Sequence, residues 1–119
     1  MNDRRPMGAL ESDVLGVLWK AGTPCTPADV LDRLDVELAY TTVMTILTRL
    51  WQKGLADRAK IGRSYGYSAA ISQSDLVASR MRDQLARSTD RIETMSRFVD
   101  GLNPKEALQL RKLLEGRPE

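Results

Sequence analysis

Apolar residues recur at helical spacing near the start of the chain. Leu10, Val14, Val17 and Leu18 follow the three- and four-residue steps of an amphipathic helix over residues 8–20. A glycine and a proline follow within a few positions, which is typical of a helix end. The pattern therefore predicts a first helix that turns one apolar face toward a core.

A capping sequence precedes the second predicted helix. Thr26 can accept hydrogen bonds from the first turn, and Pro27 suits the first helical position. Asp29 stands where a capping box places its acidic member. We therefore expect a short helix from about Pro27 to about Asp35.

The third predicted helix, over residues 39–53 with a stop at Gly54, has two contrasting faces. Its apolar face carries Val43, Ile46, Leu47 and Leu50. The opposite face is polar and consists of Thr41, Thr42, Thr45, Thr48, Arg49 and Gln52. Short threonine side chains let a helix approach base edges closely, and their methyl groups can contact thymine. The alternative is that the hydroxyls only bond back to the preceding turn of the helix.

A β-hairpin is predicted after this helix. Residues 55–60 and 65–69 alternate in the manner of strands around a turn-like segment, 61–64. The turn carries Arg63, with Lys60 and Tyr65 on either side. Helices followed by a hairpin with a basic tip are the order of a winged helix-turn-helix, whose third helix enters the DNA major groove. The alternatives are that the hairpin only covers the core, or that the winged fold binds a protein or RNA.

The last third of the chain predicts only helices, over residues 74–87, 89–100 and 104–115. Apolar positions at near-heptad steps are Met81, Leu85, Ile92, Met95, Val99 and Leu102. Such a slim segment cannot bury its own leucines, so we expect it to pair with the same segment of a second chain. The alternative is that it folds back on the winged part. The predicted fold class is mainly α with a small β-hairpin: a winged helix-turn-helix over residues 1–71 and a helical dimerisation domain over 72–119.

The amino-acid composition excludes several classes of catalytic and metal-binding site. The 119 residues include no histidine and one cysteine, Cys25, which excludes Ser-His or Cys-His catalysis, a His-His metal site and a disulfide within the chain. We therefore expect no enzyme, no metal and no cofactor, and we expect Cys25 to be a small buried residue rather than a redox switch. No apolar stretch approaches the ~18–20 residues that cross a bilayer, so a cytoplasmic location without direct membrane binding is expected.

The net charge of +2 hides an uneven distribution. Segment 40–69 has a net charge of +4, whereas residues 1–39 have a net charge of −3. Its basic residues are Arg49, Lys53, Arg58, Lys60 and Arg63, against the single acid Asp57. This basic segment coincides with the predicted recognition helix and wing, as a nucleic-acid footprint would. The alternative is an ordinary solvated surface.

The run 39–50, AYTTVMTILTRL, followed by Lys53-Gly54-Leu55, resembles the penicillinase-repressor family, the BlaI/MecI/CopY regulators. Leu10-Glu11 and Leu18-Trp19 extend the resemblance upstream, and it covers about residues 8–115. The resemblance implies a homodimeric repressor that binds palindromic operators on double-stranded DNA, typically with TACA/TGTA half-sites. It places DNA contacts at Thr41, Thr42, Thr45, Thr48, Arg49, Arg63, Ser64 and Tyr65. It places dimer contacts at Leu76, Met81, Leu85, Ile92, Met95, Phe98, Val99, Leu110, Leu113 and Leu114.

The same resemblance raises two questions of regulation. Antibiotic-responsive members are inactivated by cleavage at an Asn-Phe bond, which makes a membrane sensor protease a candidate partner. The matching bond here is Arg97–Phe98, where arginine replaces asparagine, so a protease would need a different specificity. Copper-responsive members carry a C-terminal Cys-x-Cys pair that this chain lacks, which argues against metal sensing.

Two other functions compete with the repressor. One is a protein-interaction module whose threonine face meets a protein, although such faces are usually more aromatic and apolar. The other is a small enzyme using carboxylates such as Asp29 or Asp32, whose positions are better explained by capping and solvation.

Overall fold

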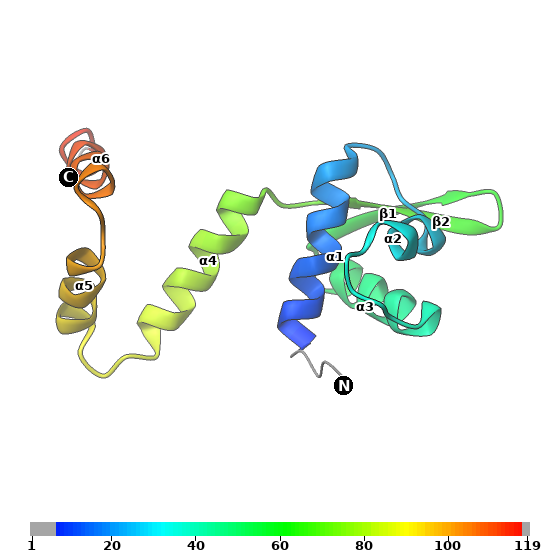
Figure 1. The fold of residues 1–119 in the computed structure, drawn as a ribbon, viewed down its shortest axis with the longest axis horizontal. Helices are drawn as coiled ribbons and strands as arrows, with labels where there is room; N and C mark the ends of the chain where they lie inside the picture. The colour runs from blue at the N-terminus through cyan, green and yellow to red at the C-terminus, as the bar shows by residue number, and fades with distance from the viewer. Residues whose placement is uncertain (1–6, 118–119) are drawn as a thin grey trace. The chain divides into compact units, whose positions relative to one another are not determined.

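The computed structural model describes residues 7–117, so residues 1–6 and 118–119 lie outside the described residues. The elements are α1 (Met7–Ala21), α2 (Pro27–Arg33), α3 (Tyr40–Gln52), β1 (Ala56–Ile61), β2 (Ser64–Ala69), α4 (Gln73–Ala86), α5 (Arg91–Asp100) and α6 (Pro104–Glu115) (Figure 1). This order confirms the predicted mainly helical fold with a winged helix-turn-helix and its hairpin. The predicted limits agree with the observed ones to within two residues.

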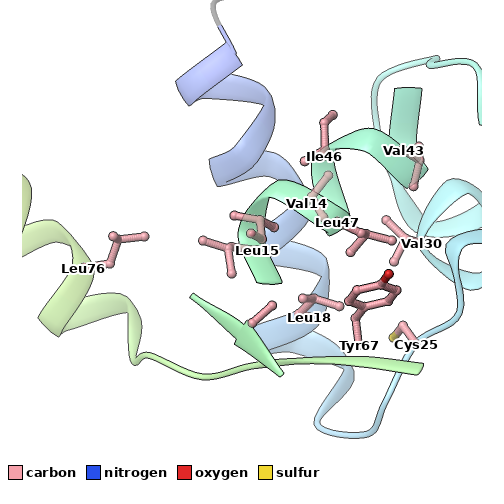
Figure 2. Close-up of a cluster of buried hydrophobic side chains, with 12 residues drawn as sticks. Val14, Leu15, Leu18, Cys25, Val30, Val43, Ile46, Leu47, Tyr67 and Leu76 are labelled. Atoms are coloured by element: carbon pink, nitrogen blue, oxygen red, sulfur yellow. The ribbon is translucent and has the colours of Figure 1, made fainter. Parts of the chain in front are cut away.

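The core of the winged part lies where α1, α2, α3 and the hairpin meet (Figure 2). Its fully buried aliphatic side chains are Val14, Leu15, Val30, Val43, Ile46, Leu47 and Leu50. The predicted face of α3 is buried in full, and burial of these side chains supplies the main driving force for folding. In α1 the prediction is only partly right, because Leu15 is fully buried although it is not on the predicted face, whereas Leu10 and Val17 are half-buried. The polar face of α3 is thereby left toward solvent, whereas Glu11 of α1 is buried.

The segment before α2 joins β2 through an isolated antiparallel β-bridge. Cys25 and Tyr67 exchange backbone hydrogen bonds, at 2.9 Å from Cys25 N to Tyr67 O and 2.8 Å from Tyr67 N to Cys25 O. The indole Nε1 of Trp19 donates to the carbonyl of Ile71 at 2.8 Å, just after β2. These bonds tie the base of the wing to α1 and to the start of α2.

The predicted capping box of α2 is present. Thr26 Oγ1 accepts from the Asp29 amide at 3.2 Å, and the Thr26 amide donates to Asp29 Oδ2 at 3.0 Å. These hydrogen bonds lower the pKa of Asp29 below its ordinary value. Capping accounts for this carboxylate without any catalytic role.

Cys25 is buried, with 1% of its surface exposed. Burial raises the pKa of its thiol, the nearby Asp29 adds to the increase, and Arg33 partly opposes it. Because the reactive form is the thiolate, both inaccessibility and the raised pKa make this thiol inert at neutral pH.

A thiol-reactive reagent tests this placement. At neutral pH, native protein should react at least about tenfold more slowly than protein unfolded in guanidinium chloride, because reaction requires the structure to open. The absorbance of released thionitrobenzoate measures both rates. Equal rates in the two conditions would contradict the burial of Cys25.

The chain divides into two compact units, the first ending at Leu76 and the second beginning at Val77. The division falls within α4, because Leu76 is 6% exposed and belongs to the core of the winged unit. The predicted boundary between residues 71 and 72 precedes this helix. In the second unit, α5 and α6 bury no residue.

Among residues 7–117, no helix has the length and apolarity needed to span a membrane.

Candidate nucleic-acid interface

Helix α3 presents to solvent the polar face that its sequence predicts. Its apolar positions lie in the core, and on the other side Thr41, Thr45, Arg49 and Gln52 are exposed while Thr42 and Thr48 are half-buried. The helix ends at Gln52, with Lys53 as its C-cap, and Gly54 follows with a φ of 77°, a conformation that glycine adopts without strain. The face is therefore a continuous strip of short polar side chains that becomes basic toward its C-terminal end.

The threonine hydroxyls do not all behave alike. Thr45 Oγ1 donates to the carbonyl of Thr41 at 2.9 Å, so this proton is used within the helix. No such bond involves the hydroxyls of Thr41, Thr42 or Thr48 in the described structure. The back-bonding alternative therefore applies to Thr45 alone, and the group that Thr45 offers outward is mainly its methyl.

The wing is a two-stranded antiparallel sheet with a tight turn. Ile61 pairs with Ser64, so Gly62 and Arg63 form a two-residue turn, and Gly62 has a φ of 61°. A positive φ at the first central residue is the arrangement for which type II′ hairpins use glycine. The turn places Arg63, which is exposed, at the tip of the wing.

The hairpin register decides which wing residues share a face. Lys60 pairs with Tyr65, and Arg58 pairs with Tyr67, so these four side chains lie on one face. Ser64, predicted with Arg63 and Tyr65 as a wing contact, lies on the opposite face with Ile61. The sequence predicts contacts by Arg63, Ser64 and Tyr65, and the register adds the exposed Lys60, which strand alternation could have indicated.

The opposite face of the wing is closely packed at Gly66. A Cβ built at this position would collide with Cδ1 of Ile61 and lie 3.0 Å from Cβ of Pro24. The glycine therefore lets the Ile61 side chain lie across the strand next to the Cys25 segment.

Arg58 links the wing to the recognition helix. Its guanidinium carbon lies 3.6 Å from the ring centroid of Trp51, near the end of α3, and 4.2 Å from that of Tyr65 in β2. Its Nη1 also donates to the hydroxyl of Tyr67 at 3.5 Å. We call this group, Trp51, Arg58, Tyr65 and Tyr67, the aromatic clamp. Sequence patterns do not reveal it, because its members meet only in the fold.

Lys53 is engaged in an ion pair that lowers the effective charge of the interface. Its Nζ lies 2.8 Å from Oε1 and 2.9 Å from Oε2 of Glu11, which is 3% exposed and comes from α1. The pair joins α1 to the end of α3. Lys53 itself stays 56% exposed in this pair, and the other exposed basic side chains of segment 40–69 are Arg49, Lys60 and Arg63.

The tail residues predicted for dimerisation differ in exposure. Met81, Ile92, Met95, Phe98, Val99, Leu113 and Leu114 are exposed, from 41% at Met95 to 74% at Ile92, and Leu85 and Leu110 are half-buried. Leu76 differs, because it is buried in the winged core and has little surface left for another chain. A run of exposed apolar side chains on charged helices indicates a surface that another molecule covers.

The predicted cleavage bond, Arg97–Phe98, lies inside α5. Arg97 Nε donates to Glu93 Oε1 at 2.9 Å across one helical turn. Proteases prefer mobile, exposed backbone, so α5 would have to unwind locally before this bond could be cut. Within the described range, no group of three or more His, Cys, Asp or Glu side chains is arranged to hold a metal.

Comparison with known proteins finds a matching family model and a curated relative from two strains of one species. A family model described as "Penicillinase repressor" matches residues 7–116. "Transcriptional regulator BlaI" from Mycobacterium tuberculosis, in strains CDC 1551 / Oshkosh and H37Rv, is 36% identical over 113 residues, which are 91% of this chain and 82% of the relative.

Solved structures of regulators are similar at lower identity. Bordetella bronchiseptica BpsR is 20% identical with a TM-score of 0.49, over 96% of this chain and 75% of that one. A mutant of MarR from E. coli is 18% identical with a TM-score of 0.49, over 90% and 74% of the two chains.

Proposed function

Because the chain belongs to the penicillinase repressor family, we propose that it is a homodimeric, sequence-specific repressor that binds palindromic promoter operators with TACA/TGTA-type half-sites. Family membership confirms the resemblance seen in the sequence. The curated relatives are transcriptional regulators, so the chain is a regulator of transcription and not an enzyme.

One observation carries the DNA-binding proposal. The threonine face of α3 and the basic residues of the wing belong to the same compact unit, with Arg49 exposed on α3, Lys60 on β1 and Arg63 in the turn of the wing. No side chain caps the first turn of α3, which begins after Ala39, so its amides and the positive end of the helix dipole favour a phosphate. Phosphate contacts would set the position of the helix, and the threonines and Arg49 would read bases.

The tail supports the dimer. The exposed apolar side chains of α4 to α6 are what a second copy would cover. One winged unit offers few basic contacts, and two units held together bind at a high effective concentration. We assign DNA binding to residues 1–71 and dimerisation to 72–119, with Leu76 serving the winged core instead.

Induction would act through the tail. Cutting or loosening it separates the two DNA-binding units without touching α3. Cleavage at Arg97–Phe98 by a membrane sensor protease is one such route, and it requires α5 to unwind. The repressor would work in the cytoplasm, where a bacterial chromosome lies.

Selection from a random pool of DNA duplexes tests the proposal. We expect the full-length protein to enrich an inverted repeat with TACA/TGTA half-sites. The logarithm of its association constant should fall with the logarithm of salt concentration, with a slope of up to about −5 for six basic contacts in a dimer. Gel shifts across a salt series measure this slope. Failure to enrich any sequence, with salt-independent retention of a protein partner, would favour the protein-interaction module.

A further inference from the structure

We propose that Arg58 is a positioning residue, which holds the wing against the end of the recognition helix so that Arg63 reaches the DNA backbone. The inference rests on the proposed function, because it concerns how the same interface is held in shape. The aromatic clamp joins three elements through one guanidinium: Trp51 of α3, Arg58 of β1 and Tyr65 of β2.

The geometry separates Arg58 from the other basic residues of the interface. The guanidinium carbon of Arg58 lies 3.6 Å from the ring centroid of Trp51 and 4.2 Å from that of Tyr65. Its Nη1 donates to the hydroxyl of Tyr67, a residue that is 4% exposed. A planar, weakly hydrated guanidinium can stack against two aromatic rings, which an ammonium group cannot match. Arg58 is therefore committed to contacts within the protein, whereas Arg63 is exposed at the turn.

The aromatic clamp lies at the point of the hairpin beyond which the wing would be free to move. The base of the hairpin is tied to the winged core through Cys25 and Tyr67. Beyond Tyr67 the strands continue to the turn, and Tyr65 is the outermost residue of the clamp, paired with Lys60. Releasing Tyr65 from Arg58 would let the outer hairpin swing relative to α3, so that Arg63 would no longer hold a fixed place on the duplex.

The test uses full-length protein and the duplex that the wild type itself selects from the random pool. Four substitutions are compared: Arg58→Met, Arg58→Lys, Arg63→Met and the double change Arg58→Met/Arg63→Met. Arg58→Met keeps a long unbranched side chain and removes the guanidinium, and Arg63→Met removes the same group at the wing tip. Lys20→Met, at an exposed position in α1, is the control for loss of one positive charge. Each protein is measured for Kd across a salt series and for thermal unfolding.

If Arg58 positions Arg63, either single methionine substitution should make the dimer's salt slope shallower by about 2, one phosphate contact per protomer. The double change should be no worse than Arg63→Met, since both remove the same contact. Arg58→Lys should behave like Arg58→Met despite keeping the charge. A double change that makes the slope shallower by about 4 would instead show that Arg58 contacts a phosphate directly. Wild-type binding by Arg58→Lys would show the same, and either result would overturn the proposal.

A second pair of variants covers the case in which Arg58→Met fails to fold. Tyr65→Phe and Tyr65→Leu both remove the hydroxyl that a DNA contact would use, but only Tyr65→Leu removes the ring that stacks on Arg58. Tyr65→Leu should therefore give a shallower slope than Tyr65→Phe, close to that of Arg63→Met. Equal slopes for the two Tyr65 variants would contradict the clamp. If the wild type binds no duplex, the proposed function fails and the inference with it. If Arg63→Met alone changes the slope, only the inference fails.

Discussion

Replacing Phe98 with aspartate is expected to convert the protein to monomers and to weaken operator binding by about 100- to 10,000-fold. Phe98 is 49% exposed on α5, and no residue of this helix is buried within the single chain. The substitution therefore removes no core contact of the monomer. It places a charge in the surface that a second copy would cover, where an unpaired charge is strongly unfavourable.

Two measurements check this expectation. Sedimentation equilibrium gives the oligomeric state, and gel shifts on the selected duplex give Kd. Arg97→Gln is a matched control, because it changes the net charge by the same amount at the neighbouring residue, on the side of α5 that carries Glu93. A Phe98→Asp protein that remains dimeric would show that the α5 surface does not form the dimer.

Replacing Arg49 with methionine is expected to cost about 1–3 kcal/mol in each half-site, or about 2–6 kcal/mol for the dimer on its operator. Arg49 is exposed on the polar face of α3, so removing its guanidinium should leave the fold intact. Binding to unrelated DNA should fall less, because sequence-independent binding depends mainly on the total phosphate contacts.

Thr45 gives a finer test of the same face. Its hydroxyl proton is used by the Thr41 carbonyl, so Thr45→Ser, which removes the methyl, should weaken specific binding more than Thr45→Val, which keeps it. Competition gel shifts with operator and unrelated duplexes measure both, with Lys20→Met as the control. Unchanged specific binding by the Arg49 and Thr45 variants would refute the placement of the recognition face.

Much of the fold is predictable from local patterns in the sequence. The apolar faces of α1 and α3, the capping box at Thr26 and Asp29, and the glycine turn at Gly62 each depend on residues a few positions apart. Helical spacing also separates the threonine face of α3 from the core. For these features the physical cause lies within one element, so its limits and its exposed side follow from the sequence.

The sequence alone does not indicate which basic side chains have partners within the protein. The net +4 of segment 40–69 counts Lys53 and Arg58 with the other basic residues. In the fold, Lys53 pairs with Glu11 of α1, and Arg58 is held between Trp51 and Tyr65. Two of the five cations are therefore engaged within the protein, although Lys53 stays 56% exposed, because a residue's partners can come from distant parts of the chain.

By itself, the sequence determined the order of the elements, the family and the apolar positions of the helical tail. Only the tertiary structure decided that Leu76 serves the winged core, that Cys25 joins the wing through Tyr67, and that Lys53 pairs with Glu11. Periodicity and capping act between neighbours along the chain, whereas burial, strand register and ion pairing depend on which distant segments the folded core brings together.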